Sequence, residues 1–330
     1  MIRSLHAGLG PIGLQILAAT VDERVARPVA AADIDPRLRG CPLGQVLSRP
    51  ELDAVTVRPD LESAIADAED GEGSDVVVLA TGSFLPDIAD QILLCVDRGL
   101  NVVSTSEQLN WPWLRSPDLA DEIDALAKDR GVTVVGTGIN PGLLLDLLPL
   151  LLCRPSLNIR SVTARRIVNV SLRRPQLQRK VGSAMNPDEY QRLADQGLVG
   201  HVGLAESAAM LASGMGWSPV SVDETIAPVI ATEQTGTEHF TIQPGQVMGS
   251  HQEARVAGPD GREIHLVCRM THGEPDPRDE IVIDGDPPVH MRIENGIFGD
   301  TATAGCTAKI LRLTVEAKPG LLTVKDLPVA

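Results

Sequence analysis

Short runs of β-branched and small apolar residues alternate with amphipathic segments along about the first 140 residues of the chain. The runs lack regular polar alternation, which is typical of strands buried on both faces of a parallel sheet. Proline opens and glycine closes the intervening helices, as at Pro86 and Gly99. This order predicts a doubly wound α/β domain of Rossmann type, with strands over 2–7, 29–32, 55–57, 76–80, 102–104 and 132–135.

After Pro155 the pattern changes to longer stretches in which apolar and polar residues alternate. Such alternation favours strands that bury one face only. We therefore expect a dinucleotide-binding domain over 1–140 and a second α+β domain of mixed or antiparallel sheet over 141–330. A last helix over 301–316 is a candidate to pack back on the first domain. The second domain is expected to hold strands over 157–172, 220–230, 239–247, 263–270 and 280–283, and helices over 187–196 and 204–215.

Composition excludes several classes of partner. The net charge of -15 argues against nucleic acid, which requires clustered Lys and Arg. The most apolar run, residues 143–153, contains Asp146 and Pro149 and is far shorter than the roughly 20 residues of a membrane span, so we expect a buried helix and no membrane contact. Five scattered cysteines without a Cys-x-x-Cys pair predict reduced thiols in a cytoplasmic protein. The histidines and cysteines form no cluster with metal-ligand spacing, so no metal site is expected.

A glycine-rich turn follows the first predicted strand and opens a helix. Gly8, Gly10 and Gly13, with Pro11 and Ile12 between them, form a G-x-G-x-x-G string. The first glycine permits the turn, the second lets the backbone approach a pyrophosphate, and the third lets helix and strand pack closely. Asp33 follows Gly13 by 20 residues, where a carboxylate accepts hydrogen bonds from the adenosine ribose. The sequence therefore predicts binding of NAD or NADP; Asp33 favours NAD, whereas Arg37 and Arg39 could capture a 2′-phosphate, so the preference stays open.

Ligands of open parallel sheets lie outside the carboxyl ends of the strands, where three loops qualify. Thr81, Gly82 and Ser83 follow the fourth strand, and the third loop, which contains Ile139, Asn140 and Pro141, follows the sixth. The second loop ends in Glu107, which is the one carboxylate in the three loops. Among apolar neighbours a glutamate can serve as a general base; the alternative is an ordinary solvated loop glutamate.

The amino-acid sequence of the chain resembles the 2,4-diaminopentanoate dehydrogenase family. That family includes native NAD(P)-dependent amine dehydrogenases and shares its N-terminal domain with dihydrodipicolinate reductases. The glycine string is common to many enzymes, whereas the Asn-Pro-Gly loop and the C-terminal strings are more specific. The matching stretches run from one end of the chain to the other: 8–13, 32–36, 80–84, 103–107, 138–142, 200–204, 275–280, 299–304 and 317–323.

The resemblance implies a reversible reaction in which an amine, NAD(P)+ and water give a carbonyl compound, ammonia and NAD(P)H. It also implies a homodimer formed through the second domain, and it places Glu107 at the position of the family's catalytic glutamate. Dihydrodipicolinate reductases carry a His-His and Lys constellation after the last strand of the first domain, and nothing similar follows Val135. Sugar-type oxidoreductases have Glu-Lys-Pro where this chain reads Glu107-Gln108-Leu109.

Other polar residues are candidates for substrate contact. Asn140 stands in a loop that can serve coenzyme and substrate alike, and the other candidates lie in the predicted second domain: Arg166, Asn169, His201, His251 and Thr303. Each of these has the alternative of a purely structural role, such as helix capping for Thr303. Two other functions stay open: reduction of a carbon–nitrogen double bond without incorporation of ammonia, and a dinucleotide-binding sensor without turnover.

Overall fold

The computed structural model describes residues 1–217 and 221–329 and divides the chain into two compact units. The first unit joins Met1–Gly142 to Phe298–Ala330, and the second is Leu143–Ile297. The first boundary lies two residues beyond the predicted one. The predicted second domain differs more, since it ran to residue 330, whereas the structure returns the C-terminal segment to the first unit.

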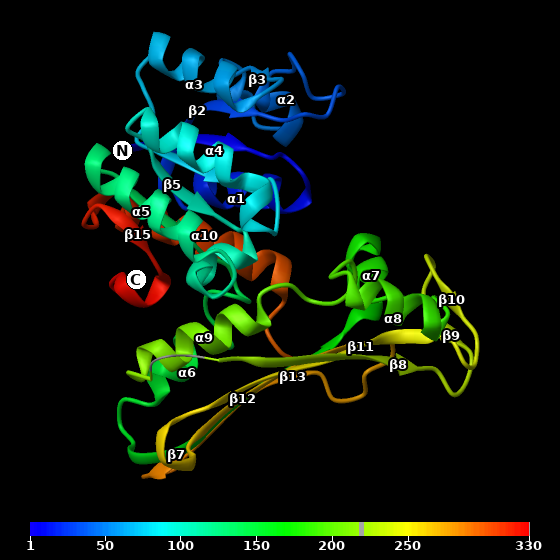
Figure 1. Cartoon of the computed structure of the whole chain (residues 1–330). Helices are drawn as coiled ribbons and strands as arrows, with labels where there is room; N and C mark the ends of the chain where they lie inside the picture. The colour runs from blue at the N-terminus through cyan, green and yellow to red at the C-terminus, as the bar shows by residue number, and fades with distance from the viewer. Residues whose placement is uncertain (218–220, 330) are drawn as a thin grey trace. The chain divides into compact units, whose positions relative to one another are not determined.

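The first unit is built on a parallel sheet, as predicted (Figure 1). Its strand order is β15-β6-β5-β4-β1-β2-β3, and every neighbouring pair runs parallel. The order reverses between β1 and β4, which is the switch point where doubly wound sheets bind ligands. The strands are β1 (Ile2–Ala7), β2 (Ala26–Ala32), β3 (Val57–Arg58), β4 (Val76–Leu79), β5 (Asn101–Ser104), β6 (Thr133–Gly136) and β15 (Gly320–Leu322).

Helices cover both faces of this sheet. Ile65, Ile92 and Ile123 bring α3 (Leu61–Asp70), α4 (Leu85–Asp97) and α5 (Pro117–Arg130) into the core of one face. Ile16 of α1 (Pro11–Asp22) and Leu311 of α10 (Gly299–Glu316) share the core of the other face. The returning helix α10 therefore contributes to one hydrophobic layer of the first unit, which is why it belongs to that unit. Shorter elements are α2 (Leu43–Leu47), η1 (Pro50–Leu52), η2 (Glu107–Asn110), η3 (Pro112–Leu114) and η6 (Val324–Asp326).

The second unit is an α+β domain, also as predicted. Its described residues form a mixed sheet in the order β14-β13-β7-β12-β11-β8, in which β7 and β12 are parallel and the other neighbours antiparallel. Its strands are β7 (Leu157–Asn169), β8 (Asp223–Ile230), β11 (Val247–Ala257), β12 (Glu263–Thr271), β13 (Arg278–Asp286) and β14 (Val289–Glu294), with a small separate hairpin of β9 (Thr235–Gly236) and β10 (Thr241–Ile242).

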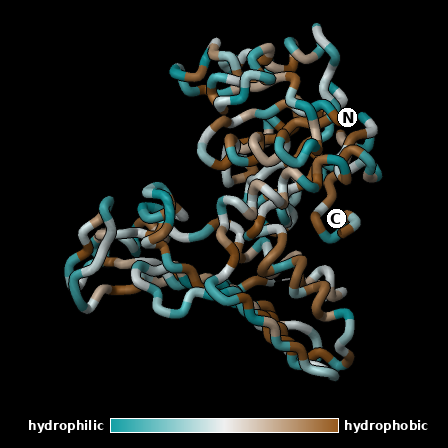
Figure 2. Tube along the Cα trace, turned by 180° about the vertical axis from the view of Figure 1, so that it is seen from behind, coloured by the Kyte–Doolittle hydropathy of each residue, from teal (hydrophilic) through white to brown (hydrophobic). Residues whose placement is uncertain are grey.

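The helices of the second unit are drawn on one side of its sheet (Figure 1). Leu204, Ala208 and Leu211 of α9 pack on inward-facing residues of the strands to form its core. The apolar run 143–153 contributes a helix of six residues, shorter than the run itself. The helices are α6 (Leu147–Leu152), α7 (Pro175–Lys180), α8 (Pro187–Asp195) and α9 (Leu204–Gly214), with the turns η4 (Val170–Leu172) and η5 (Pro259–Gly261). In Figure 2 the apolar (brown) positions gather along the strands and helices of each unit.

One predicted strand is wrong. Residues 239–247 do not form a single strand, because β10 ends at Ile242 and a turn with Gly245 at φ +86 precedes β11. The Pro244-Gly245 pair is the turn signal that the alternation masked. Val220, the first residue of another predicted strand, lies outside the described residues.

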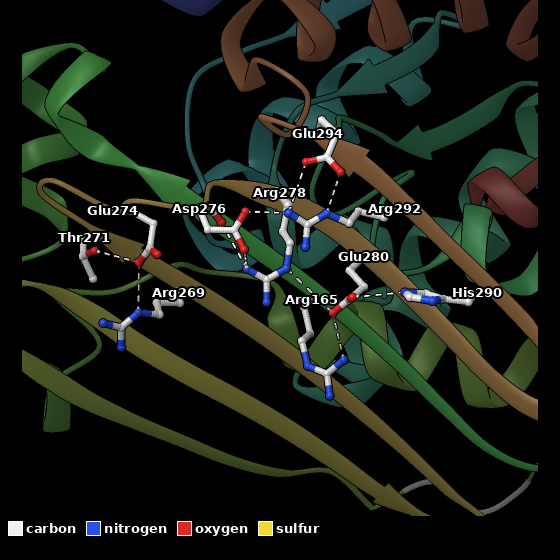
Figure 3. Close-up of polar contacts among 10 residues, drawn as sticks. All are labelled: Arg165, Arg269, Thr271, Glu274, Asp276, Arg278, Glu280, His290, Arg292 and Glu294. Atoms are coloured by element: carbon white, nitrogen blue, oxygen red, sulfur yellow. Dashed lines mark hydrogen bonds and ion pairs between the residues drawn. The ribbon is translucent and has the colours of Figure 1, made fainter.

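The sheet face opposite α9 carries charged pairs (Figure 3). Arg165 of β7 bonds to Glu280 of β13 at 3.1 Å, and His290 of β14 lies 3.1 Å from the same carboxylate. Ile167 and Val267 are buried on this face, each paired across the strands with arginines such as Arg269 and Arg165. The aliphatic stems of arginines can cover apolar neighbours while their guanidinium groups stay in water.

Two absences concern the described residues alone. None of their helices is long and apolar enough to cross a membrane. No group of three or more His, Cys, Asp or Glu side chains among them is placed to hold a metal ion.

A buried histidine predicts acid sensitivity. His6 of β1 is buried, with its Nε2 3.0 Å from the Ser4 hydroxyl oxygen, and burial lowers the pKa of its imidazole to about 3. Below pH 6.5 the imidazole is protonated in the unfolded chain but stays neutral in the folded chain. The free energy of unfolding therefore falls by up to about 1.4 kcal/mol per pH unit towards pH 3. We expect His6→Gln to unfold in urea with a shallower dependence on pH between 6.5 and 4 than the wild type. Identical dependence in both proteins would contradict this assignment.

Candidate coenzyme and active site

The glycine turn between β1 and α1 fits the carboxyl edge of the sheet closely. Gly8 has φ +85, and a Cβ atom there would lie 2.5 Å from the Ala80 carbonyl oxygen. A Cβ at Gly13 would lie 1.8 Å from the Gly8 carbonyl oxygen. A Cβ at Gly10 would meet nothing within 4 Å. Gly8 and Gly13 are therefore required by packing, whereas Gly10 leaves open space at the turn.

The start of α1 offers an anion site. Gly10 is its N-cap and provides no side-chain hydrogen bond, and Pro11 stands in the first turn. The first N–H groups of a helix lack intrahelical acceptors and carry the positive end of the helix dipole. Ile12 and Gly13, in this same turn, present backbone that suits a pyrophosphate, as the sequence predicts.

Asp33 is fixed just after the end of β2. Its Oδ2 accepts a hydrogen bond from the Leu9 N–H at 2.5 Å, and its Oδ1 accepts from the Asp35 N–H at 2.7 Å. The carboxylate borders a cavity of about 520 Å³, a size typical of small-molecule sites. The cavity is lined by Ala7, Gly8, Gly10, Ala32, Asp33, Ile34, Asp60, Leu61, Glu62, Ala80, Thr81, Gln91 and Leu94.

The lining of this cavity includes four residues that the sequence predicts for coenzyme binding, namely Gly8, Gly10, Asp33 and Thr81. Thr81 donates its hydroxyl hydrogen bond to Gln91 Oε1 at 2.7 Å. Arg37 does not line the cavity: its exposed guanidinium bonds to Asp35 at 2.6 Å. Open space at Gly10, an uncapped helix start and an oriented carboxylate fit the phosphate and ribose groups of a dinucleotide.

Glu107 stands at the start of η2, two loops along the same edge. The Ser83 carbonyl oxygen accepts hydrogen bonds from the Ser106 hydroxyl at 2.9 Å and from the Gln108 N–H at 3.2 Å. Gln108 Oε1 in turn accepts from the Leu85 N–H at 2.9 Å, at the start of α4. The residues on either side of Glu107 are thus tied to the loop after β4, which contains Gly82 and Ser83.

The other side of η2 is held by β6. A Cβ at Gly136 would lie 2.5 Å from the Leu109 carbonyl carbon, so glycine is needed for this close approach. Glu107 itself is half-buried. The result is a carboxylate on a braced turn at the carboxyl end of β5, where it can accept or return a proton.

The loop after β6 also contributes to this edge. It contains a cis peptide bond between Asn140 and Pro141, and Ile139 is buried. Gly142 comes so close to the Gly138 backbone that a Cβ would lie 2.5 Å from its nitrogen. Thr303 of α10 has its methyl group 3.8 Å from where a Cβ of Gly138 would stand. The structure therefore brings Thr303 next to the loop of Ile139, Asn140 and Pro141.

The four candidates from the second unit do not share one face of its sheet. Arg166 points to the helix-covered face, where it bonds to Asp279 at 3.1 Å and to the Ile297 carbonyl oxygen at 2.9 Å. His201 is held on that side through its backbone by Gln252, with its N–H donating to Gln252 Oε1 at 3.0 Å. This pairing assigns Arg166 a structural role.

The opposite face takes the other two candidates. His251 lies 2.9 Å from Glu253 there, and Asn169, which follows the alternation of β7, accepts from the Ser171 N–H at 3.0 Å. Arg166 and His251 thus lie on opposite faces of the sheet, because odd and even positions of a strand face opposite ways. Contact of any of these four residues with substrate stays a prediction.

Sequence reasoning missed the three other polar lining residues, Asp60, Glu62 and Gln91, as well as the bracing role of Gln108. Asp60 and Glu62 follow β3, which is only two residues long and carries little signal. The Pro59-Asp60 pair before an amphipathic helix was the available sign, since Asp60 is the N-cap of α3.

Substitution of the second and third glycines of the string is expected to affect different properties, coenzyme binding at Gly10 and stability at Gly13. Gly10→Ala fills the space that the pyrophosphate needs, so we expect NADH binding to weaken by about tenfold or more, while stability drops by no more than about 1 kcal/mol because alanine is a poorer N-cap. Gly13→Ala forces backbone apart, so we expect a loss of about 2 kcal/mol or more of folding free energy. Calorimetric titration with NADH and urea unfolding measure both effects. Equal loss of stability in the two variants would refute the distinction.

Comparison with known proteins identifies relatives of this chain. Residues 143–330 match the family model for the 2,4-diaminopentanoate dehydrogenase C-terminal domain. The chain is 31% identical to the 2,4-diaminopentanoate dehydrogenase of Acetoanaerobium sticklandii over 87% of this chain and 84% of that protein. It is 25% identical to an amine dehydrogenase of Streptomyces virginiae over 99% of this chain and 96% of that protein.

A solved structure, that of the amine dehydrogenase from Mycobacterium smegmatis, superposes with a TM-score of 0.87 at 25% identity, covering 99% of this chain and 96% of that one. The chain belongs to the 2,4-diaminopentanoate dehydrogenase family, the NAD(P)-dependent oxidoreductases that act on amines.

Proposed function

We propose that this chain catalyses the reversible oxidative deamination of a small aliphatic amine, with Glu107 as the general base. The observation that carries the proposal is the braced position of Glu107 at the carboxyl edge of the sheet, in a chain whose relatives are named for amine oxidation. The overall change is amine, NAD(P)+ and water to carbonyl compound, ammonium and NAD(P)H.

The coenzyme, when bound, supplies hydride transfer to and from the substrate carbon. Gly8, Gly10 and the first turn of α1 would hold its pyrophosphate, and Asp33 its adenosine ribose. Thr81, Gly82, Ser83 and Asn140 stand on the neighbouring loops and are proposed to complete the coenzyme site.

Glu107 moves protons at each stage of this scheme. Its carboxylate first takes a proton from the ammonium form of the substrate, which leaves the nitrogen lone pair to stabilise the carbon that loses hydride, and it then releases this proton to solvent. The ionised carboxylate next takes a proton from the water that adds to the resulting iminium ion and passes it to the nitrogen. As ammonia leaves, the carboxylate accepts the hydroxyl proton of the carbinolamine, which becomes the carbonyl compound. A base held in place by neighbouring backbone avoids the cost of ordering it during the reaction.

Substrate contacts are proposed for Ile139, Asn140, Pro141 and Thr303, which the structure brings together. Substrate contacts of Arg166, Asn169, His201 and His251 stay predictions. A cytoplasmic location stays a prediction from the cysteine pattern. A carbon–nitrogen double-bond reductase and a sensor are the alternatives that the following assay separates.

The assay follows NADH or NADPH oxidation by the full chain with small ketones and aldehydes. We expect turnover that requires ammonium, and amine as the product. We expect Glu107→Gln to lose about 10² to 10⁴ in kcat/KM, because the amide cannot accept the proton, while dinucleotide binding persists. Glu122→Gln, an exposed glutamate of α5, serves as the matched control with unchanged rate.

Each contrary result has a distinct meaning. Oxidation without ammonium would support the reductase alternative. Dinucleotide binding without turnover of any amine or carbonyl compound would support the sensor. Full activity of Glu107→Gln would exclude Glu107 as the base while leaving the reaction in place.

We also propose that the chain forms a homodimer through the sheet face opposite α9 (Figure 3). A two-fold interface must be complementary to itself, and this face offers both signs of charge in adjacent rows, such as Arg292 bonded to Asp276 at 2.5 Å and Arg278 bonded to the same residue at 2.8 Å.

Sedimentation measures the mass of the protein in solution and thereby tests the proposed dimer. We expect a dimer, and a shift towards monomer in Glu280→Arg, because that change sets a third cation beside Arg165 and Arg278. Arg312→Glu on the exposed side of α10 is the matched control and should leave the mass unchanged. A monomeric wild type would contradict the proposal.

A further inference from the structure

The cavity beside the glycine turn has a charged lining of one sign. Its lining residues include the carboxylates Asp33, Asp60 and Glu62, and no Lys or Arg is among those that line it within the described residues. Asp33 comes from the end of β2, and the other two from the loop and first turn after β3. Carboxylates therefore border this space from two neighbouring strands.

Asp60 is bound in place as the N-cap of α3. One of its oxygens accepts a hydrogen bond from the Ser63 N–H at 2.7 Å. That bond lowers the pKa of the Asp60 carboxyl, so the group stays ionised at neutral pH. The start of α3 would otherwise attract an anion, as helix N-termini do. Here the cap supplies a fixed negative charge at that place instead.

Two arginines follow β2, and neither lines the cavity. Arg37 is held by both oxygens of Asp35, at 3.1 and 2.6 Å, and its pKa is raised by that contact. Arg39 donates to the Ile34 carbonyl oxygen at 2.9 Å. The charge of Arg37 is thus already paired with a carboxylate, and the lining of the cavity itself contains no guanidinium group within the described residues.

Glu62 differs from the other two in its contacts. Asp60 and Glu62 are both exposed, but Arg98 lies 3.8 Å from Glu62 while bonding more closely to Glu69 at 3.1 Å, so part of the Glu62 charge is compensated. Asp33 and Asp60 are the carboxylates of the lining that backbone hydrogen bonds hold in place.

We propose that Asp60, acting with Asp33, makes this chain selective for NAD by excluding the 2′-phosphate of NADP. The inference rests on the proposed dinucleotide site but not on the amine reaction. A 2′-phosphate carries about -1.5 to -2 charges near neutral pH and would enter a rim that holds two oriented carboxylates. The unphosphorylated ribose of NAD has hydroxyl groups, which can donate hydrogen bonds to those carboxylates.

The test measures dissociation constants of NADH and NADPH by calorimetry with the full chain and no substrate. We expect the wild type to bind NADH at least about 30-fold more tightly than NADPH. Asp60→Ser keeps an N-cap but removes the charge, so it should narrow that ratio about three- to tenfold by tightening NADPH, with NADH little changed. Asp70→Asn, at the far end of α3 and outside the cavity lining, is the matched control and should leave the ratio as in the wild type.

The dependence of coenzyme binding on salt distinguishes electrostatic repulsion of the 2′-phosphate from a steric effect. Raising salt from 50 to 500 mM screens the repulsion, so the NADPH-to-NADH ratio of dissociation constants should fall in the wild type and change less in Asp60→Ser. The proposal is overturned if the wild type binds NADPH as tightly as NADH, if Asp60→Ser weakens both coenzymes equally, or if the ratio is independent of salt. A selective NADH binder without amine turnover would refute the proposed reaction and leave this inference standing.

Discussion

Two hydrogen bonds to one carbonyl oxygen, that of Ser83, determine where Glu107 stands. The Ser106 hydroxyl and the Gln108 N–H both donate to it, from the residues on either side of the glutamate. The loop after β5 is thereby fixed to the loop after β4, next to the glycine turn that packs on Ala80. The two bonds converge on one acceptor from both sides of Glu107, which limits movement of the turn. The phosphate site and the proposed base are consequently parts of one rigid edge.

The C-terminal segment gives this edge its support. Leu311 and Ala304 of α10 complete the apolar layer under β4 and β5, and β15 extends the sheet beside β6. The family model that matches residues 143–330 therefore covers the second unit and also elements that belong to the first. The dinucleotide unit is interrupted in sequence by the second unit, and its core is complete only after the chain returns.

Much of the first unit could be predicted from the sequence, because buried parallel strands leave runs such as Val76–Leu79 and their loops are bounded by glycine. The glycine turn, Asp33 and the place of Glu107 after β5 were predictable for the same reason. Asp60 was not, because β3 is too short to carry a pattern and its loop could not be assigned to the edge. Arg166 and His251 lie on different strands, so their placement on opposite faces of the sheet depends on the register between strands. The alternation within one strand does not give that register. The long-range bonds of Gln108 leave no mark in local sequence.

A crystal structure with the nicotinamide coenzyme bound would test the central claim most directly. The account predicts that the carboxylate of Glu107 faces the reactive C4 edge of the nicotinamide ring, within reach of a substrate nitrogen, while Gly10 lies against the pyrophosphate and Asp33 against the adenosine ribose. A complex in which the Glu107 carboxylate points to bulk solvent, remote from C4, would contradict it.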